Sequence, residues 1–268
     1  MTEKRAWFYD FLFICVLLIA GYLRLTGVEW GEGYHQHPDE LFLTGVLDNL
    51  RAHACDAPLT SVDACPPDQR HWLSIGEYFD TATSTLSPYN RGYAFFVYGN
   101  LPMTLVRYAM EMTGNDDMGM SKFFARQFSA LADLFTIFIL YLIVSNLYGR
   151  RIGLFAATFS AFTVMQIQQS HFFTTDLFTN LFMFLAIYFA VAIVDDRENG
   201  NQGLEIGDQR LEELANPEKP ISNYQSPITN LQLSISSFIR NPLFWLSIGF
   251  GIALGMAMAS KINAAALA

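Results

Sequence analysis

The sequence predicts an all-α, polytopic helix bundle that is embedded in a membrane. Of the 268 residues, 52% are hydrophobic and 15% are charged, whereas soluble domains carry about a quarter charged residues. The apolar residues also stand in long blocks, near the length of about 20 residues that crosses the hydrocarbon core of a bilayer. A formal net charge of −9 leaves no basic surface to neutralise phosphates, which excludes nucleic acid as an expected partner.

About five transmembrane helices are expected. The first apolar block follows Lys4 and Arg5, and it is too long for a cleaved signal peptide, so it should remain as a helix that starts on the inner side. The five expected spans are residues 7–27, 123–147, 152–169, 172–194 and 242–262. Because the last span ends close to Ala268 with no polar tail, we expect the chain, a single domain over 1–268, to be the N-terminal part of a longer protein.

Two polar loops separate these spans. Residues 28–122 form the expected external loop, and apolar residues between Leu43 and Leu50 recur there at helical spacing, which predicts an amphipathic helix at the membrane surface. Residues 195–238 are acidic and rich in Asn and Pro, which is typical of a flexible loop, here on the cytoplasmic side.

Residues 93–113 within the external loop have two interpretations. Their apolar run is interrupted by Gly99-Asn100-Leu101-Pro102, so the segment fits either a span or an interfacial helix. If it spanned, Arg150 and Arg151 would fall outside, against the excess of basic residues found on the inner side of membrane proteins. We therefore expect an interfacial helix, which also places the turn at 170–176 on the outer side.

The three cysteines lie in two different regions of the chain. Cys15 lies within the first span, whereas Cys55 and Cys65 share the external loop. These two are disulfide candidates on an oxidising side of the membrane. Two free thiols fit the sequence equally well, because pairing cannot be deduced from it.

His37-Pro38-Asp39-Glu40 places two adjacent carboxylates in the external loop. A carboxylate at such a position is a candidate general base. The same residues suit the start of a helix, since proline fits the first turn and acids interact favourably with the positive end of the helix dipole. By itself the motif favours the helix start over catalysis.

Arg126 and Asp133 are ionisable residues within one expected span. A separation of nearly two turns places them on the same side of the helix, with Asp133 about 10 Å deeper. Ionisable groups at such depth usually face the bundle interior and mark function. Hydrogen bonding between helices explains Asp133 as well, and snorkelling to the interface explains Arg126.

The turn between the spans 152–169 and 172–194 carries His171 and Asp176. Asp176 fits plain helix capping together with Thr175, or a second carboxylate that faces Asp39 across an external cavity. His171 fits an acceptor or metal site, or a partly buried histidine with ordinary hydrogen bonds.

Two further cations stand near the outer ends of spans, Arg24 in the first and Lys261 in the last. Each is explained by snorkelling or by contact with a lipid phosphate. With Arg126 they would stabilise a phosphate leaving group, while a carboxylate accepts the proton of an incoming hydroxyl. Asp176 would then hold a divalent cation such as Mg or Mn, which prefers oxygen ligands.

Short motifs in a fixed order along the chain carry a resemblance to a known family. They are His37-Pro38-Asp39-Glu40, Ser87-Pro88-Tyr89-Asn90, Tyr98-Gly99-Asn100-Leu101-Pro102, Ala125-Arg126-Gln127-Phe128-Ser129-Ala130-Leu131, Leu147-Tyr148-Gly149-Arg150-Arg151, Gln169-Ser170-His171-Phe172-Phe173-Thr174-Thr175-Asp176 and Ala259-Ser260-Lys261-Ile262-Asn263. On these residues the chain resembles the GT-C glycosyltransferases, in the group of protein O-mannosyltransferases and aminoarabinose transferases. It looks closest to bacterial dolichyl-phosphate-mannose–protein mannosyltransferase-like members.

The resemblance implies an inverting transfer of a mannose-like sugar from a polyprenyl-phosphate donor to an acceptor hydroxyl, on the extracytoplasmic face of the cell membrane. It implies that Asp39, in the pair with Glu40, is the general base, that Arg126 contacts the donor phosphate, and that Asp176 takes part in metal or acceptor binding. The acceptor, a protein, a lipid or a glycan, stays open. Family members have more spanning helices than this chain, so an incomplete active site is expected.

Two other functions fit the composition. A transporter or channel would line its pathway with Arg126 and Asp133, and it predicts broken helices paired by an internal repeat, which the sequence does not show. A non-catalytic membrane subunit predicts that Asp39→Asn leaves activity unchanged. The enzyme interpretation requires Asp39 and Asp176 to lie near each other on one face.

Overall fold

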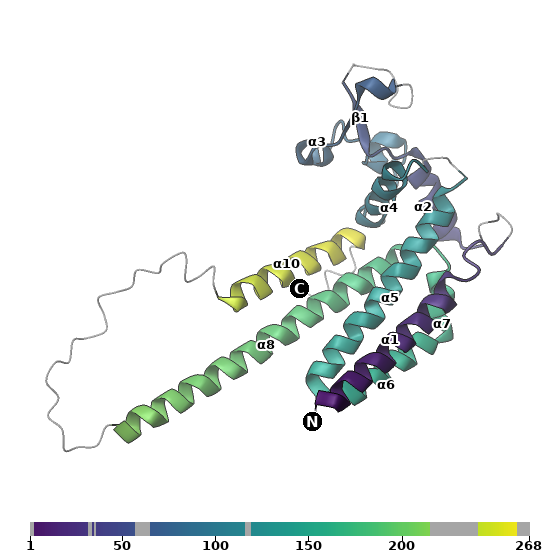
Figure 1. Ribbon diagram of the computed structural model, residues 1–268. Coiled ribbons are helices and arrows are strands. Elements are labelled where there is room, and N and C mark those ends of the chain that lie inside the picture. Colours follow the sequence, from purple (N-terminus) through teal and green to yellow (C-terminus); the bar gives the residue numbers. More distant parts are fainter. Residues whose placement is uncertain are drawn as a thin grey trace, which may run out of the picture.

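The computed structural model describes residues 3–31, 34, 36–56, 65–115, 119–214 and 241–261. It shows a bundle of long helices that carries a small subdomain at one end, labelled by β1, α2, α3 and α4 in Figure 1. We call this end of the bundle the hairpin end and the opposite end the Gly149 end. The all-α membrane bundle predicted from the sequence is confirmed.

Among the described residues, four helices are long and apolar enough to cross a membrane. They are α1 (Glu3–Leu25), α5 (Ser121–Tyr148), the first part of α8 (Thr175–Leu214) and α10 (Pro242–Ser260). The central helix α8 has α5 on one side and α10 on the other, and α1 packs against α5 away from α8 (Figure 1). Trp7 and Leu18 on α1 are 71% and 69% exposed, as expected for side chains that face lipid.

The predicted span at 152–169 is not one helix. It is divided into α6 (Arg150–Phe162) and α7 (Val164–Ser170) by Thr163, whose backbone is extended at φ −67 and ψ 112. The Thr163 hydroxyl donates to the carbonyl of Phe159 at 2.7 Å, a local bond that competes with regular helix geometry. The two pieces together run from the Gly149 end back to the hairpin end, beside α1 and α5 (Figure 1).

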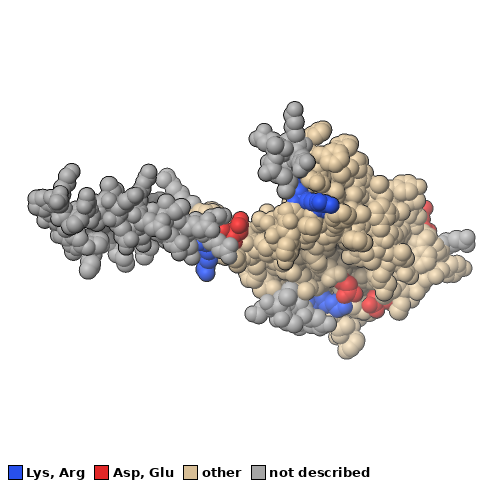
Figure 2. All heavy atoms as spheres, turned by 90° about the horizontal axis from the view of Figure 1, so that it is seen from below, with Lys and Arg blue, Asp and Glu red and all other residues tan. Residues whose placement is uncertain are grey.

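The predicted loop at 195–238 begins later than expected. Helix α8 continues without a break to Leu214, since this stretch is rich in Glu, Gln, Leu and Arg, which are good helix formers. The rest of the predicted loop lies outside the described residues. Seen from below, the surface of the bundle is mostly uncharged, with charged side chains in a few separate groups (Figure 2), which agrees with a membrane-embedded body.

The hairpin subdomain contains helices, a two-stranded sheet and 3-10 turns. In order these are α2 (Pro38–Asn49), β1 (His53–Cys55), η2 (Pro67–Gln69), β2 (Arg70–Trp72), α3 (Ile75–Phe79), η3 (Pro88–Arg91) and α4 (Leu101–Met112). Strands β1 and β2 pair antiparallel, and a disulfide joins Cys55 to Cys65. The disulfide pairing, which the sequence left open, is thus present in the structure.

The structure contains the helices that the sequence predicts in this subdomain, and their position at the membrane surface stays a prediction. Helix α2 buries Leu43, Val46 and Leu47 completely, as the helical spacing predicts. Helix α4 has 12 residues, which is too short to cross a bilayer, so residues 93–113 do not span. These helices share one apolar core with the hairpin ends of α5 and α8, and this shared core fixes the subdomain on the bundle.

Candidate active site

The adjacent carboxylates of Asp39 and Glu40 lie in different environments. Pro38 opens α2, and the His37 ring caps it by accepting a hydrogen bond from the Asp39 amide at its Nδ1, 3.2 Å away. Successive residues on a helix point about 100° apart, since a turn takes 3.6 residues. Glu40 is therefore fully buried, whereas Asp39 is partly exposed. The helix start and a candidate catalytic carboxylate coexist in one motif.

Glu40 forms a buried ion pair with Arg126. The Nε and Nη2 of Arg126 donate to the two carboxylate oxygens, each at 2.6 Å, and Nη1 donates to the carbonyls of Val28 and Trp30 at 2.9 and 3.0 Å. Glu40 also accepts from the Phe173 amide at 3.0 Å. Both side chains are fully buried, so this pair joins α2, α5, the turn after α1 and the start of α8.

Arg24 and Asp133 form a second buried pair within the bundle. The Nε of Arg24 donates to Asp133 at 2.5 Å, and Nη1 donates to the carbonyl of Ala161 at 2.9 Å. Nη2 reaches the carbonyl of Ser160 at 3.3 Å. The helix break at Thr163 interrupts the regular hydrogen bonds of these carbonyls, and Ser160 accepts in addition from the Thr163 amide at 3.3 Å. Arg24 therefore caps the end of α6 as well as neutralising Asp133.

These two pairs bear on the expected phosphate contacts. Arg24 and Arg126 are both fully buried and bonded within the protein. Donor-phosphate binding by these arginines and catalysis by Glu40 stay predictions. All three side chains have a structural role here, because a buried ion pair that loses one partner strands a charge in a medium of low dielectric constant.

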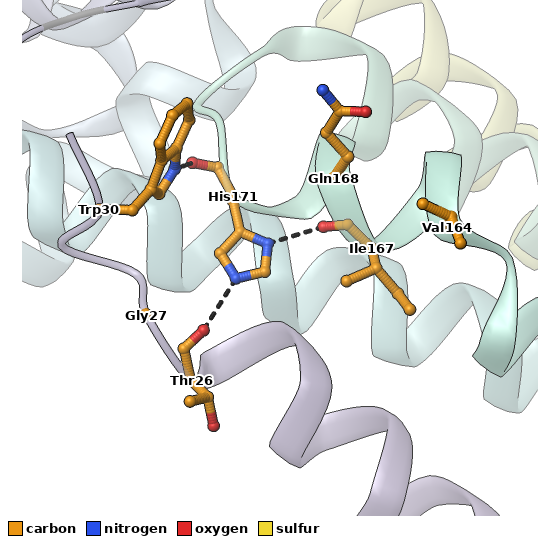
Figure 3. A pocket seen from close by; sticks show the side chains of 7 residues that line it. All are labelled: Thr26, Gly27, Trp30, Val164, Ile167, Gln168 and His171. Carbon is orange, nitrogen blue, oxygen red and sulfur yellow. Dashed lines mark hydrogen bonds between the residues drawn. The ribbon is translucent and has the colours of Figure 1, made fainter.

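His171 lies in a different place from Asp176. Its ring nitrogens face the carbonyl oxygens of Ile167 and Thr26, at 2.7 and 2.9 Å, and its own carbonyl accepts from the Trp30 indole at 3.2 Å (Figure 3). These residues line a pocket of about 530 Å³ between the end of α1 and α7. His171 thus holds α7 to the turn after α1, and the structure does not bring it together with Asp176.

Asp39 and Asp176 both act on the hydroxyl of Tyr98. The Tyr98 hydroxyl is hydrogen-bonded to the Asp39 carboxylate, and both carboxylates act on it electrostatically. Burial, the bond to Asp39 and the charges of Asp39 and Asp176 raise the pKa of Tyr98 above its ordinary value of 10.0. The hydroxyl thus stays protonated at neutral pH and acts as a donor to Asp39.

Lys261 completes this cluster. It follows the last residue of α10, and its Nζ lies 2.5 Å from the Asp176 carboxylate in the first turn of α8. The side chains of Lys261 and Asp176 are 31% and 52% exposed. In contrast to the buried arginines, the Lys261 side chain is partly exposed. We call Asp39, Tyr98, Asp176 and Lys261 the open cluster.

A close backbone contact at Gly99 positions the open cluster. The Gly99 amide donates to the carbonyl of Ser260 at 3.2 Å. A Cβ at position 99 would lie 2.1 Å from the Ala259 carbonyl oxygen, so only glycine allows the loop to approach α10 this closely. The neighbouring Tyr98 is thereby held near Lys261. Tyr98 was missed as a site residue from the sequence, although a glycine beside an aromatic residue in a loop is a signal of such an approach.

A polar cavity of about 290 Å³ extends from Asp176 into the bundle. It lies between α5, α7 and α8 and is lined by Asp133, Thr136, Met165, Gln166, Gln169, Asp176, Leu177, Asn180 and Phe184. Amides, a hydroxyl and carboxylates in one cavity provide both donors and acceptors of hydrogen bonds. Such a lining suits a ligand that carries many hydroxyl groups.

The described carboxylates do not form a metal centre by themselves. Within the described ranges there is no group of three or more His, Cys, Asp or Glu side chains that could hold a metal ion. The Asp176 carboxylate instead meets the ammonium of Lys261. A cation held by one or two carboxylates together with waters and substrate phosphates stays a prediction, and the proposed chemistry uses the described side chains alone.

Residues 108–204 match the family model described as dolichyl-phosphate-mannose-protein mannosyltransferase. The matched segment covers 97 of the 268 residues, from α4 into α8. The match confirms the resemblance seen in the sequence and supports a membrane glycosyltransferase of mannosyltransferase type. Asp176 lies inside the matched segment, whereas Asp39, Tyr98 and Lys261 lie outside it. No curated protein and no solved structure matches the chain.

Proposed function

We propose that this chain, whose matched segment is that of a mannosyltransferase, moves a mannose-like sugar from a polyprenyl-phosphate donor to an acceptor hydroxyl at the hairpin end of the bundle. The observation that carries the proposal is the open cluster, in which Tyr98 is bonded to Asp39, Lys261 is paired with Asp176, and the charges of both carboxylates act on Tyr98. The neighbouring polar cavity of about 290 Å³ receives the sugar ring. The acceptor is a protein, lipid or glycan hydroxyl.

Asp39 acts as the general base in this proposal. Its carboxylate is partly exposed and is oriented by the Tyr98 hydroxyl. It takes the proton of the acceptor hydroxyl while the acceptor oxygen bonds to the anomeric carbon of the sugar. The bond from that carbon to the donor phosphate breaks, and the phosphate leaves with the electron pair. A single displacement of this kind inverts the anomeric configuration.

Lys261 stabilises the departing phosphate in place of Arg24 and Arg126. One of its three N–H donors is used by Asp176, which leaves donors for the developing negative charge. Asp176 in turn holds the ammonium at the mouth of the cavity. Asp176 therefore acts as a positioning residue for Lys261.

The proposed site is on the extracytoplasmic side of the cell membrane. Two observations support this placement. The disulfide between Cys55 and Cys65 is at the hairpin end, and disulfides persist on the oxidising side of a membrane. Arg150 and Arg151 begin α6 at the Gly149 end, where the excess of basic residues marks the cytoplasm.

One observation, the broken helix at Thr163, favours a transport function. In transporters, the polar ends of such a break face the substrate. Here the freed carbonyls of Ser160 and Ala161 accept hydrogen bonds from the fully buried Arg24 instead. The break is thus explained by internal contacts, and the open cluster favours transfer.

The test is donor turnover by the chain in lipid vesicles. A synthetic polyprenyl-phosphate mannose labelled in the sugar is incubated with the wild type and with Asp39→Asn, and labelled product is counted with and without a chelator. Loss of the base is expected to slow turnover about 10²–10⁴-fold. Asp68→Asn, which changes an exposed acid outside the cluster, should leave the rate unchanged. Equal rates for Asp39→Asn and the wild type would exclude Asp39 as the base, and inhibition by the chelator would show that a divalent cation takes part.

A further inference from the structure

The hairpin subdomain contains a second pocket, separate from the open cluster. It has a volume of about 320 Å³ and is lined by His53, Arg70, His71, Trp72, Glu111 and Gly114. None of these residues lines the cavity at Asp176. We propose that this pocket is an accessory carbohydrate site, which binds a neutral sugar ring independently of the transfer reaction.

The sheet and the disulfide fix the shape of the pocket. His53 on β1 stands opposite Trp72 on β2 in the antiparallel register, and residues opposite each other in such a pair point to the same face. The disulfide between Cys55 and Cys65 restrains the connection between these strands. The pocket is thus held open by covalent and backbone contacts and does not require a ligand for its shape.

An aromatic face forms one wall. The Trp72 side chain is 51% exposed, and its ring stacks on Tyr108 with centroids 5.9 Å apart and an interplanar angle of 23°. The Tyr108 hydroxyl donates to the carbonyl of Leu73 at 3.4 Å, which helps to fix this stack. An ordered indole that is half open to solvent offers a flat apolar surface beside polar groups. The C–H face of a sugar ring is complementary to such a surface.

Fixed polar groups form the other wall. Glu111 accepts from the Ala52 amide at 2.8 Å and from Arg107 Nε at 2.5 Å, and it pairs with His53 Nδ1 at 2.6 Å. Arg107 is 1% exposed, and its Nη1 and Nη2 meet no acceptor within the described part of the chain. Arg107 does not line the pocket itself, whereas Glu111 and His53 do. These two side chains, fixed by the network, offer hydrogen-bonding groups to a ligand.

Charged groups at the pocket are engaged within the protein. Glu111 meets Arg107 Nε at 2.5 Å, and His71 bridges Asp56 and Glu77 at 2.7 and 2.8 Å. The Nε of Arg70 donates to the carbonyl of Cys65 at 2.9 Å. A ligand with a strong charge of either sign would have to displace one of these partners. A flat aromatic wall with hydrogen-bonding surroundings therefore favours a polyhydroxyl ligand without net charge.

The test is ligand-observed saturation-transfer NMR on the purified full chain in detergent, with methyl α-mannopyranoside and maltotriose as neutral probes and mannose 6-phosphate as the charged one. We expect at least one of the two neutral probes to bind, in the millimolar range. Trp72→Ala should weaken binding about tenfold or more, as for a buried aromatic anchor, and Trp72→Phe should retain most of it. The matched control Trp245→Ala removes an equally exposed indole on α10 and should have no effect.

Asp39→Asn separates this proposal from the proposed transfer, because it should abolish turnover and leave saccharide binding intact. Retained binding in Trp72→Phe shows that the pocket tolerates the substitution and that loss in Trp72→Ala reflects the missing aromatic face. Absence of binding by both neutral probes would overturn the proposal. So would binding that is insensitive to Trp72→Ala, or binding of mannose 6-phosphate alone.

Discussion

Two kinds of charged pair lie near the hairpin end, and they differ in their access to solvent. The carboxylate of Glu40 and the guanidinium of Arg126 are fully buried, whereas Asp176 and Lys261 are 52% and 31% exposed. The buried pair uses its hydrogen-bonding groups on the protein. The exposed pair has side chains that a ligand can still reach. Charge alone therefore does not mark the site, and the side chain that is paired yet still accessible is the better candidate.

The same contrast in solvent exposure separates two neighbouring residues of one motif. Asp39 and Glu40 are consecutive and chemically alike, but the turn of α2 directs Glu40 into the bundle and leaves Asp39 at the surface. Glu40 fixes α2 against α5 through Arg126. This places Asp39 where it can meet Tyr98. The buried residue thus positions the accessible one, and substitutions at the two positions should have different consequences.

The largest expected effect is that of Glu40→Gln on stability. The substitution leaves the Arg126 guanidinium buried without a counter-charge, which costs about 3–5 kcal/mol. Unfolding in detergent, followed by circular dichroism, measures this loss. Asp39→Asn is the matched control and should change stability by at most about 1 kcal/mol, the value of one exposed hydrogen bond. A stable but inactive Glu40→Gln protein would instead place Glu40 in the chemistry.

Lys261→Ala is expected to act on the donor and not on the fold. Removing a charge-assisted hydrogen bond to the phosphate costs about 1.5–3 kcal/mol, which corresponds to about a 10- to 150-fold weaker interaction. Steady-state turnover with labelled donor should show it in kcat/KM, and Lys261→Arg should recover part of the loss. Lys122→Ala, on the first turn of α5, is the control. Equal losses at both lysines would point to a general effect of charge.

Tyr98→Phe should have a smaller effect. The variant keeps the ring and loses the hydroxyl that donates to Asp39, and a neutral donor of this kind contributes about 0.5–1.5 kcal/mol. We expect kcat to fall up to about tenfold with little change in KM for the donor. The control is Tyr93→Phe, whose hydroxyl donates to the carbonyl of Gly45 at 2.7 Å within the same subdomain. A change confined to KM would argue against an orienting role.

The spans and the interfacial helices could be predicted because their signals are local. Apolar blocks of spanning length and the spacing of the leucines in α2 are properties of consecutive residues. The break at Thr163 was missed because no Pro or Gly marks it. Its stability depends on Arg24, which is 139 residues earlier in the chain and supplies donors to the freed carbonyls.

The site was predicted in part for the same reason. Asp39, Asp176 and Lys261 were singled out by residue type and by their place near the ends of helices. Which cations remain accessible depends on packing between distant segments, as Arg126 with Glu40 and Arg24 with Asp133 show. Tyr98 was missed because its role depends on the approach of Gly99 to α10, a contact between segments more than 150 residues apart in the sequence.

The smallest expected effect is a pH dependence of local stability in the hairpin subdomain. It concerns the exposed ion pairs of His71 with Asp56 and Glu77. The bonds of His71 to Glu77, and then to Asp56, raise the pKa of His71 above 6.5. Bonds from Ser74, and then from His71, lower the pKa of Glu77 from 4.5 to about 2. The stabilisation by His71 is fully present below pH 6.5 and is lost as pH rises through the raised value. The stabilisation by Glu77 is fully present above pH 4.5 and is lost as pH falls through the lowered value of about 2.

The contacts of α3 with β2 should therefore be strongest between about pH 4.5 and 6.5. Hydrogen exchange of the α3 amides, corrected for intrinsic rates, should quicken modestly above this range, and added salt should reduce the change because the groups are exposed. His71→Gln should remove the dependence on the alkaline side. The buried Glu40–Arg126 pair provides the internal comparison, since the α5 amides around Arg126 should not respond over the same range. A response of equal size in α5 would mean that the two kinds of charged pair are not energetically distinct.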